Sequence, residues 1–144
     1  MELNEPEEPI QPTKNNQDYD VEIYSRSAIW GFSIFFSTIF GGILLMLNLR
    51  AAGYKKAGNQ VLLFSIAYLL ISSLLLDALG ASPYVALAFN MIGAAILTQY
   101  FFNKYFPEAD YYPKSIAIPL LVSILICIPI GVFMYYYGPK AGIK

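Results

Sequence analysis

The chain has 144 residues, of which 57% are hydrophobic and 13% are charged, and its formal net charge is −1. Because soluble domains carry roughly 25% charged residues, this composition predicts a membrane protein. The sequence has no histidine and a single cysteine, Cys127, which excludes an intramolecular disulfide, a Cys/His zinc site and a histidine-based triad. We therefore expect no cofactor and no metal, and the charge gives no sign of nucleic-acid binding.

The N-terminal segment is acidic and rich in proline. Its first 27 residues hold seven acids against Lys14 and Arg26, with Pro6, Pro9 and Pro12 among them. Such a segment cannot bury enough apolar surface to order itself. The sequence predicts a disordered acidic tail over residues 1–23 and one transmembrane domain over residues 24–144. Docking of the tail onto a partner is the alternative.

Four apolar stretches follow the tail. A bilayer core of about 30 Å needs about 20 apolar residues in a helix. The stretches that meet this length are 28–49, 61–79, 84–102 and 115–137. Pro83 falls in the first turn of the third, where its missing amide hydrogen costs nothing. Only a few residues join the second and third stretches, which predicts an antiparallel hairpin. The expected fold is all-α, an antiparallel four-helix transmembrane bundle.

Four spans would place both termini on one side of the membrane. The termini side would carry Lys14, Arg26, Lys140 and Lys144, and the loop side Arg50, Lys55, Lys56, Lys104 and Lys114. Cytoplasmic loops carry an excess of Lys and Arg. The small excess on the loop side favours cytoplasmic loops with both termini outside.

Small and weakly polar residues recur at helical spacing within the spans. The candidate packing residues are Ser33, Ser37, Gly41 and Asn48 in the first span, Asn90 in the third, and Ser123, Cys127 and Gly131 in the fourth. Helices in lipid associate through close packing and interhelical hydrogen bonds, which small residues permit. We interpret these faces as packing surfaces and not as a binding site. The side-chain amides of Asn48 and Asn90 need more hydrogen-bond partners than a packing role alone requires.

Asp77 is the one acid inside any predicted span. An intramembrane acid is a functional candidate, yet Asp77 falls near the end of the second span, at the interface. Three interpretations stay open. Asp77 forms an interfacial ion pair with Arg26 or Lys140, it couples ions, or it is solvated. The ion pair is favoured because a helix C-terminus disfavours a negative charge that lacks a cation.

The runs "YSRSAIWGFSIFFSTIFGGILLMLNLR" and "YFFNKYFPEADYYPK" resemble a group of uncharacterised small four-span membrane proteins of Bacteroidetes-type bacteria. The resemblance covers roughly residues 24–137. It implies residence in a bacterial cytoplasmic (inner) membrane and carries no activity, so it assigns no functional residue.

Two functions compete on these observations. The first is a non-catalytic membrane protein, an accessory, scaffold or partner-binding subunit that contacts the lipid bilayer and other membrane subunits or itself. The second is a small homo-oligomeric transporter or channel that uses Asp77, Asn48 and Asn90. A membrane enzyme is disfavoured because no acid/base pair is visible inside the spans.

Overall fold

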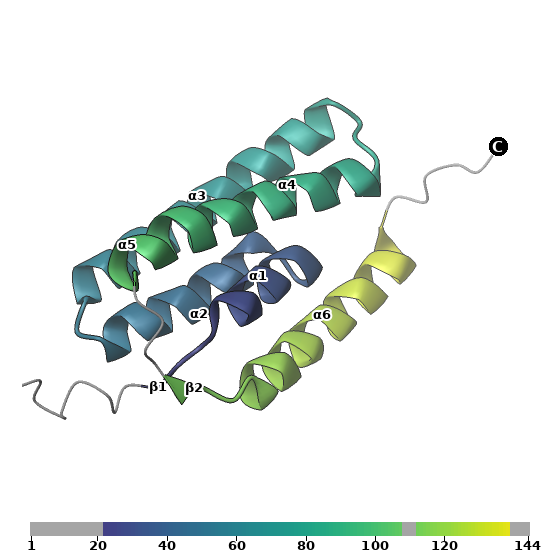
Figure 1. Ribbon diagram of the computed structural model, residues 1–144. Helices are drawn as coiled ribbons and strands as arrows, with labels where there is room; N and C mark the ends of the chain where they lie inside the picture. The colour runs from purple at the N-terminus through teal and green to yellow at the C-terminus, as the bar shows by residue number, and fades with distance from the viewer. Residues whose placement is uncertain (1–21, 108–111, 139–144) are drawn as a thin grey trace, which may run out of the picture.

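The computed structural model describes residues 22–107 and 112–138, which are almost entirely helical (Figure 1). In chain order the elements are β1 (Glu22–Ile23), α1 (Arg26–Phe35), α2 (Thr38–Ala51), α3 (Lys55–Ala78), α4 (Pro83–Ala95), the π-helix η1 (Ile96–Phe102), α5 (Asn103–Tyr105), β2 (Tyr112–Pro113) and α6 (Ala117–Tyr137). Within the described residues, three helical stretches are long and apolar enough to cross a membrane: α3, the stretch Pro83–Tyr105, and α6.

The predicted first span, 28–49, is not one helix, and this part of the prediction is wrong. Helix α1 has 10 residues and α2 has 14, and the extended backbone of Ser37 separates them. Figure 1 shows that α2 runs back alongside α1, so the two form a helical hairpin. At 1.5 Å per residue α1 is about 15 Å long, half of a bilayer core of about 30 Å.

The other three predicted spans correspond to helices. Helix α3 begins at Lys55, so the polar residues before Val61 belong to its first turns. Helix α4 begins at Pro83, which confirms the predicted place of that proline. Gly53 and Gly80 follow α2 and α3 with φ of 88° and 55°, values that suit glycine, and each ends its helix with a paired set of backbone hydrogen bonds.

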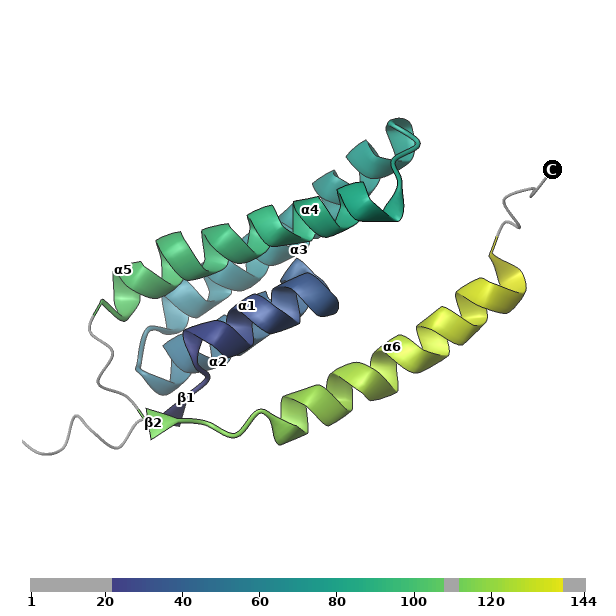
Figure 2. The same ribbon diagram turned by 45° about the vertical axis from the view of Figure 1, so that its right-hand side comes forward.

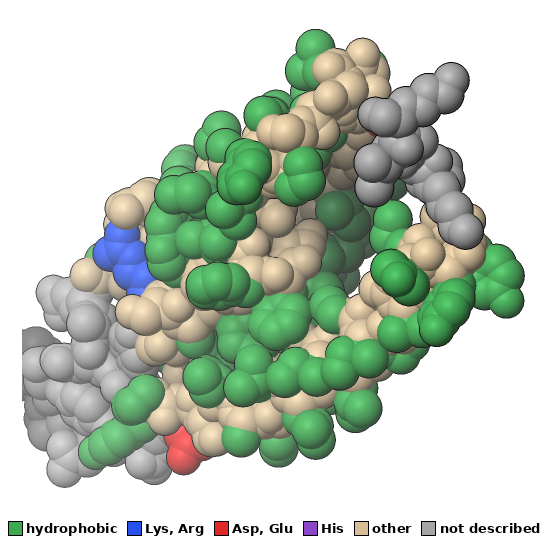
Figure 3. Space-filling model, turned by 90° about the vertical axis from the view of Figure 1, so that its right-hand side faces the viewer, with side chains coloured by type: hydrophobic (Ala, Val, Ile, Leu, Met, Phe, Trp, Pro, Cys, Tyr) green, Lys and Arg blue, Asp and Glu red, His purple; other side chains and the backbone are tan. Residues whose placement is uncertain are grey.

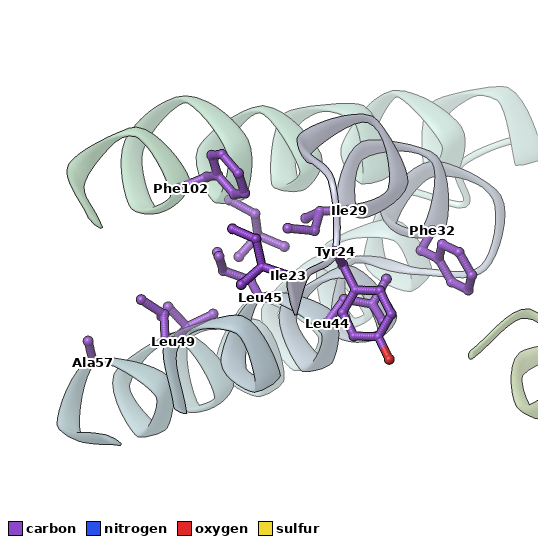
Figure 4. Close-up of a cluster of buried hydrophobic side chains, with 11 residues drawn as sticks. Ile23, Tyr24, Ile29, Phe32, Leu44, Leu45, Leu49, Ala57 and Phe102 are labelled. Carbon is purple, nitrogen blue, oxygen red and sulfur yellow. The ribbon is translucent and has the colours of Figure 1, made fainter. Parts of the chain in front are cut away.

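The hairpin of α1 and α2 forms the centre of the molecule, and α3, α4 and η1 pack against it. Figure 4 shows the buried cluster that results. Its members are Ile23, Tyr24, Ile29, Phe32, Leu44, Leu45, Leu49, Ala57, Val61, Leu97 and Phe102. The cluster joins the start of α1 to the end of α2, so the base of the hairpin is its best-packed part.

Helix α6 stands apart from this centre. Figure 2 shows it beside the hairpin near β2 and then diverging toward its C-terminal end. Ser123 is its one buried residue among 21. Apolar side chains cover most of the face seen in Figure 3, on the central helices and on α6 alike.

The strands β1 and β2 hold α6 to the hairpin base. They pair in parallel, Glu22 with Tyr112 and Ile23 with Pro113. The Lys114 amide extends the pairing by donating to the Ile23 carbonyl oxygen at 2.8 Å. Residues 22 and 23 of the predicted tail are therefore ordered, and Ile23 is buried. Residues 1–21 lie outside the described residues, so their predicted disorder stays a prediction.

Candidate functional site

At the base of the hairpin, the Asn48 side chain holds the chain that enters α1. Its Nδ2 donates to the Tyr24 carbonyl oxygen at 2.8 Å, and its Oδ1 accepts from the Tyr24 amide at 2.7 Å. Asn48 is 1% exposed. The amide therefore acts as a strand partner for the backbone of Tyr24, in an interior where water cannot satisfy those groups.

Close packing brings the two arms of the hairpin together. A Cβ at Gly41 would lie 2.8 Å from the Ile29 carbonyl oxygen and would overlap the Ser33 hydroxyl. The Ser33 hydroxyl itself donates to the Ile29 carbonyl oxygen at 2.8 Å. Ser33 and Gly41, predicted on one face of a single helix, therefore face each other across the hairpin. Ser37, predicted between them, forms the turn.

The turn leaves two hydroxyls without a partner among the described residues. Ser37 Oγ and Thr38 Oγ1 are both buried and unpaired. Helix α2 also begins there without a side-chain cap. An unpaired buried hydroxyl costs free energy, so the turn is the least satisfied point of the described interior.

Helices α3 and α4 pack on α2 through glycine in the same way. A Cβ at Gly42 would lie 2.6 Å from the Ser65 Cβ. One at Gly93 would lie 2.7 Å from Thr38 Cγ2 and 2.8 Å from the Tyr68 ring. The glycines therefore let α3 and α4 approach α2 closely.

Three further hydroxyls on α3 and the α4–η1 stretch are bonded to backbone carbonyl oxygens. Ser65 Oγ donates to Val61 and Thr98 Oγ1 to Ala94, both at 2.8 Å, and Tyr68 Oη donates to Phe89 at 2.7 Å. Hydroxyls that return to their own helix are typical of packing residues in membranes.

The basic residues gather at one end of the molecule. The starts of α1, α3 and α6 and the ends of α2 and α5 all lie at this end (Figure 1). Its Lys and Arg residues are Arg26, Arg50, Lys55, Lys56, Lys104 and Lys114. Lys104 Nζ lies 5.7 Å from the ring centroids of both Tyr100 and Tyr105. Aromatic rings beside lysines are typical of the level of the lipid headgroups.

Asp77 lies at the opposite end of the molecule. It is exposed in the last turn of α3, whereas Arg26 begins α1 beside β1. The structure therefore does not bring Asp77 and Arg26 together. Lys140, the other predicted partner, lies outside the described residues. Asn90 is half-buried on α4 and has no hydrogen-bond partner in the described part of the chain, so Asp77, Asn48 and Asn90 do not form one site.

A groove separates α6 from the hairpin, with a volume of about 250 Å³. It is lined by Tyr24, Phe32, Phe40, Ile43, Leu44, Leu47, Ile118, Pro119, Val122, Ser123 and Ile126. A smaller hollow of about 210 Å³ lies between α1 and η1, lined by Arg26, Ser27, Trp30, Thr98 and Gln99. The groove is the larger of these two hollows.

The predicted packing face of α6 divides in two. Ser123 is buried against the groove, whereas a Cβ at Gly131 would meet nothing within 4 Å. Cys127 lies between them and is half-buried. The first half of the face is thus covered by the protein's own hairpin and the second half is open.

Sequence reasoning missed Thr38, Tyr68 and Lys114 as structural or site residues. The one available signal was the pair Ser37–Thr38 four residues before Gly41–Gly42, which marks close contacts but not a turn. Among residues 22–107 and 112–138, no three His, Cys, Asp or Glu side chains gather where they could hold a metal ion.

The chain was compared with protein families, curated proteins and solved structures. No family model, curated protein or solved structure matches it.

Proposed function

We propose that this protein resides in a bacterial cytoplasmic membrane, with α3, the stretch Pro83–Tyr105 and α6 as spans. The α1–α2 hairpin enters the bilayer to about half its depth and returns to the same side. Support comes from the length and apolar character of the three helices and the short reach of α1. Irregular backbone at the hairpin turn is tolerated there because protein surrounds it.

The distribution of basic residues favours one orientation. Six of the nine Lys and Arg residues belong to the hairpin-base end, and Lys140 and Lys144 follow α6 at the other end of the sequence. By the positive-inside rule the hairpin-base end faces the cytoplasm. Three spans then place residue 22 inside and the end of α6 outside. This proposal differs from the prediction that both termini lie on one side.

We further propose that the protein is non-catalytic and serves as an accessory subunit that binds a helix of another membrane protein. The buried side chains of Asn48, Ser65 and Thr98 are bonded to the protein's own backbone. Such groups position helices and leave no buried hydroxyl or amide of these residues for a substrate.

One observation carries the proposal of a partner helix. The packing face of α6 is covered at Ser123 and open at Gly131. A glycine on an open helix face lets a second helix approach closely, and small residues are enriched at such contacts in membranes. The occupant we infer is a transmembrane helix of a different protein.

The single cysteine supplies the test, because Cys127 lies one turn before Gly131. A photoactivatable maleimide attached to Cys127 in native membranes should give one adduct with a distinct protein. Gly131→Leu should abolish that adduct because its bulk prevents close approach. Gly31→Leu is the matched control, since a Cβ at Gly31 also meets open space but on α1.

The adduct should persist in the Gly31→Leu variant. An adduct between two copies of the chain would show that the face at Gly131 binds a second copy, and it would overturn the proposal of a different protein as partner. Adducts with lipid alone, or an adduct that Gly131→Leu leaves unchanged, would overturn the proposal.

A further inference from the structure

Apolar side chains line most of the groove between α6 and the hairpin. Its walls come from the first half of α6, over residues 118–126, and from the facing side of α1 and α2. Figure 3 shows apolar side chains on both sides of the hollow between α6 and the central helices. The β1–β2 pairing holds α6 at one end of the groove.

The size of the groove selects among apolar occupants. The groove offers about 250 Å³. A dry apolar cavity of about 150 Å³ holds a benzene molecule, so by proportion this groove has room for roughly ten carbon atoms in a file. A stretch of acyl chain of this length fits the groove.

A cation lies at the headgroup end of the groove. Lys114 Nζ is 5.4 Å from the ring centroid of Tyr24, and Tyr24 lines the groove. Figure 4 shows the Tyr24 hydroxyl pointing outward from the buried cluster. The Lys114 amide is fixed by its hydrogen bond to Ile23. Its side chain is exposed and forms no ion pair with an acid in the described part of the chain.

We propose that the groove binds one acyl chain of an anionic phospholipid, with the lipid headgroup on the Lys114 ammonium. The apolar walls take the chain, and the ammonium supplies charge complementarity where the chain emerges at the headgroup level. The site rests on the membrane residence proposed above, but it is independent of any protein partner at Gly131. A failed search for that partner therefore leaves the lipid site untouched.

The purified protein tests this site in vesicles. Two preparations carry the same diazirine-labelled acyl chain, one on phosphatidylglycerol in phosphatidylcholine vesicles and one on phosphatidylcholine itself. Photolysis should place adducts on residues 118–126 and 40–47. Phosphatidylglycerol should label these peptides several-fold more than phosphatidylcholine does. Ser123→Phe, which fills the groove, should reduce labelling by both lipids.

Lys114→Gln tests the headgroup contact without disturbing the fold, because the Lys114 side chain is exposed and its substitution leaves the core unchanged. This variant should lose the preference for phosphatidylglycerol and keep labelling in the groove. Lys104→Gln, at the same basic end but over Tyr100 and Tyr105, should keep the preference. Equal labelling by the two lipids in the unmodified protein would overturn the site. Labelling spread evenly over α3 and α4, or a second copy of the chain cross-linked in the groove, would also overturn it.

Discussion

At the scale of single residues, Asn48 does more than its predicted packing role. Residues 23 and 24 are extended, so the amide and carbonyl of Tyr24 need partners from outside their own segment. The backbone of Ile23 finds its partner on the other side, in Lys114. Water is not available to these groups in an apolar interior. The side-chain amide of asparagine offers both a donor and an acceptor, so it can bond the Tyr24 carbonyl and amide together.

Asn48→Ala should lower the free energy of unfolding by about 1–3 kcal/mol for each Tyr24 backbone group that it leaves unpaired. Asn90→Ala is the control, since Asn90 is half-buried and has no hydrogen-bond partner among the described residues. It should change stability by no more than about 0.5 kcal/mol. Thermal unfolding in detergent measures both. Equal losses for the two variants would contradict the role given to Asn48.

At the scale of elements, the hairpin turn cannot be predicted from the helical periodicity of the small residues. The sequence between Phe35 and Thr38 contains neither proline nor glycine, the usual marks of a helix end. Small residues every fourth position suit a face of one helix and equally suit two helices that face each other. The close approach of Gly41 to Ser33 selects the second arrangement, because it allows the arms to pack almost backbone to backbone.

Gly41→Leu should separate the arms of the hairpin, because a side chain there would meet the Ile29 carbonyl oxygen and the Ser33 hydroxyl. Overpacking of this kind costs about 1–3 kcal/mol. Gly31→Leu, on the same hairpin but facing open space, should cost much less. The measurement is the loss of helical signal on heating in detergent. Unchanged stability of the Gly41→Leu protein would show that the arms do not touch.

At the scale of the whole molecule, the hairpin changes the number of membrane crossings in the proposed topology and therefore the proposed sidedness of the chain. The two short arms return the chain to the side from which it came, so the three long helices place residue 22 and the end of α6 on opposite sides of the proposed membrane. The basic residues, nearly balanced over four spans, then fall together at one end. The orientation proposed from the basic residues therefore agrees with the proposed three-span topology.

Cysteine labelling of a Cys127→Ser protein checks this topology. Cysteines placed at Glu22 and Tyr54 should react with an impermeant maleimide only from the cytoplasmic face, since both lie at the hairpin-base end. A cysteine at Ser82, in the exposed α3–α4 turn, should react only from outside. If Glu22 and Tyr54 label from opposite faces, the chain crosses the bilayer between them and the hairpin is not re-entrant.

The amino-acid sequence by itself determined the all-α fold class and three long apolar helices. Low charge and apolar runs are additive properties of neighbouring residues, so they predicted α3, the Pro83–Tyr105 stretch and α6 to within several residues, and the place of Pro83. What the tertiary structure alone decided are the turn at Ser37, the partners of Asn48 and Gly41, the separation of Asp77 from Arg26 and the groove beside α6. Each of these depends on which distant residues meet. Helical periodicity describes one face of one element and holds no information about the surface that covers that face.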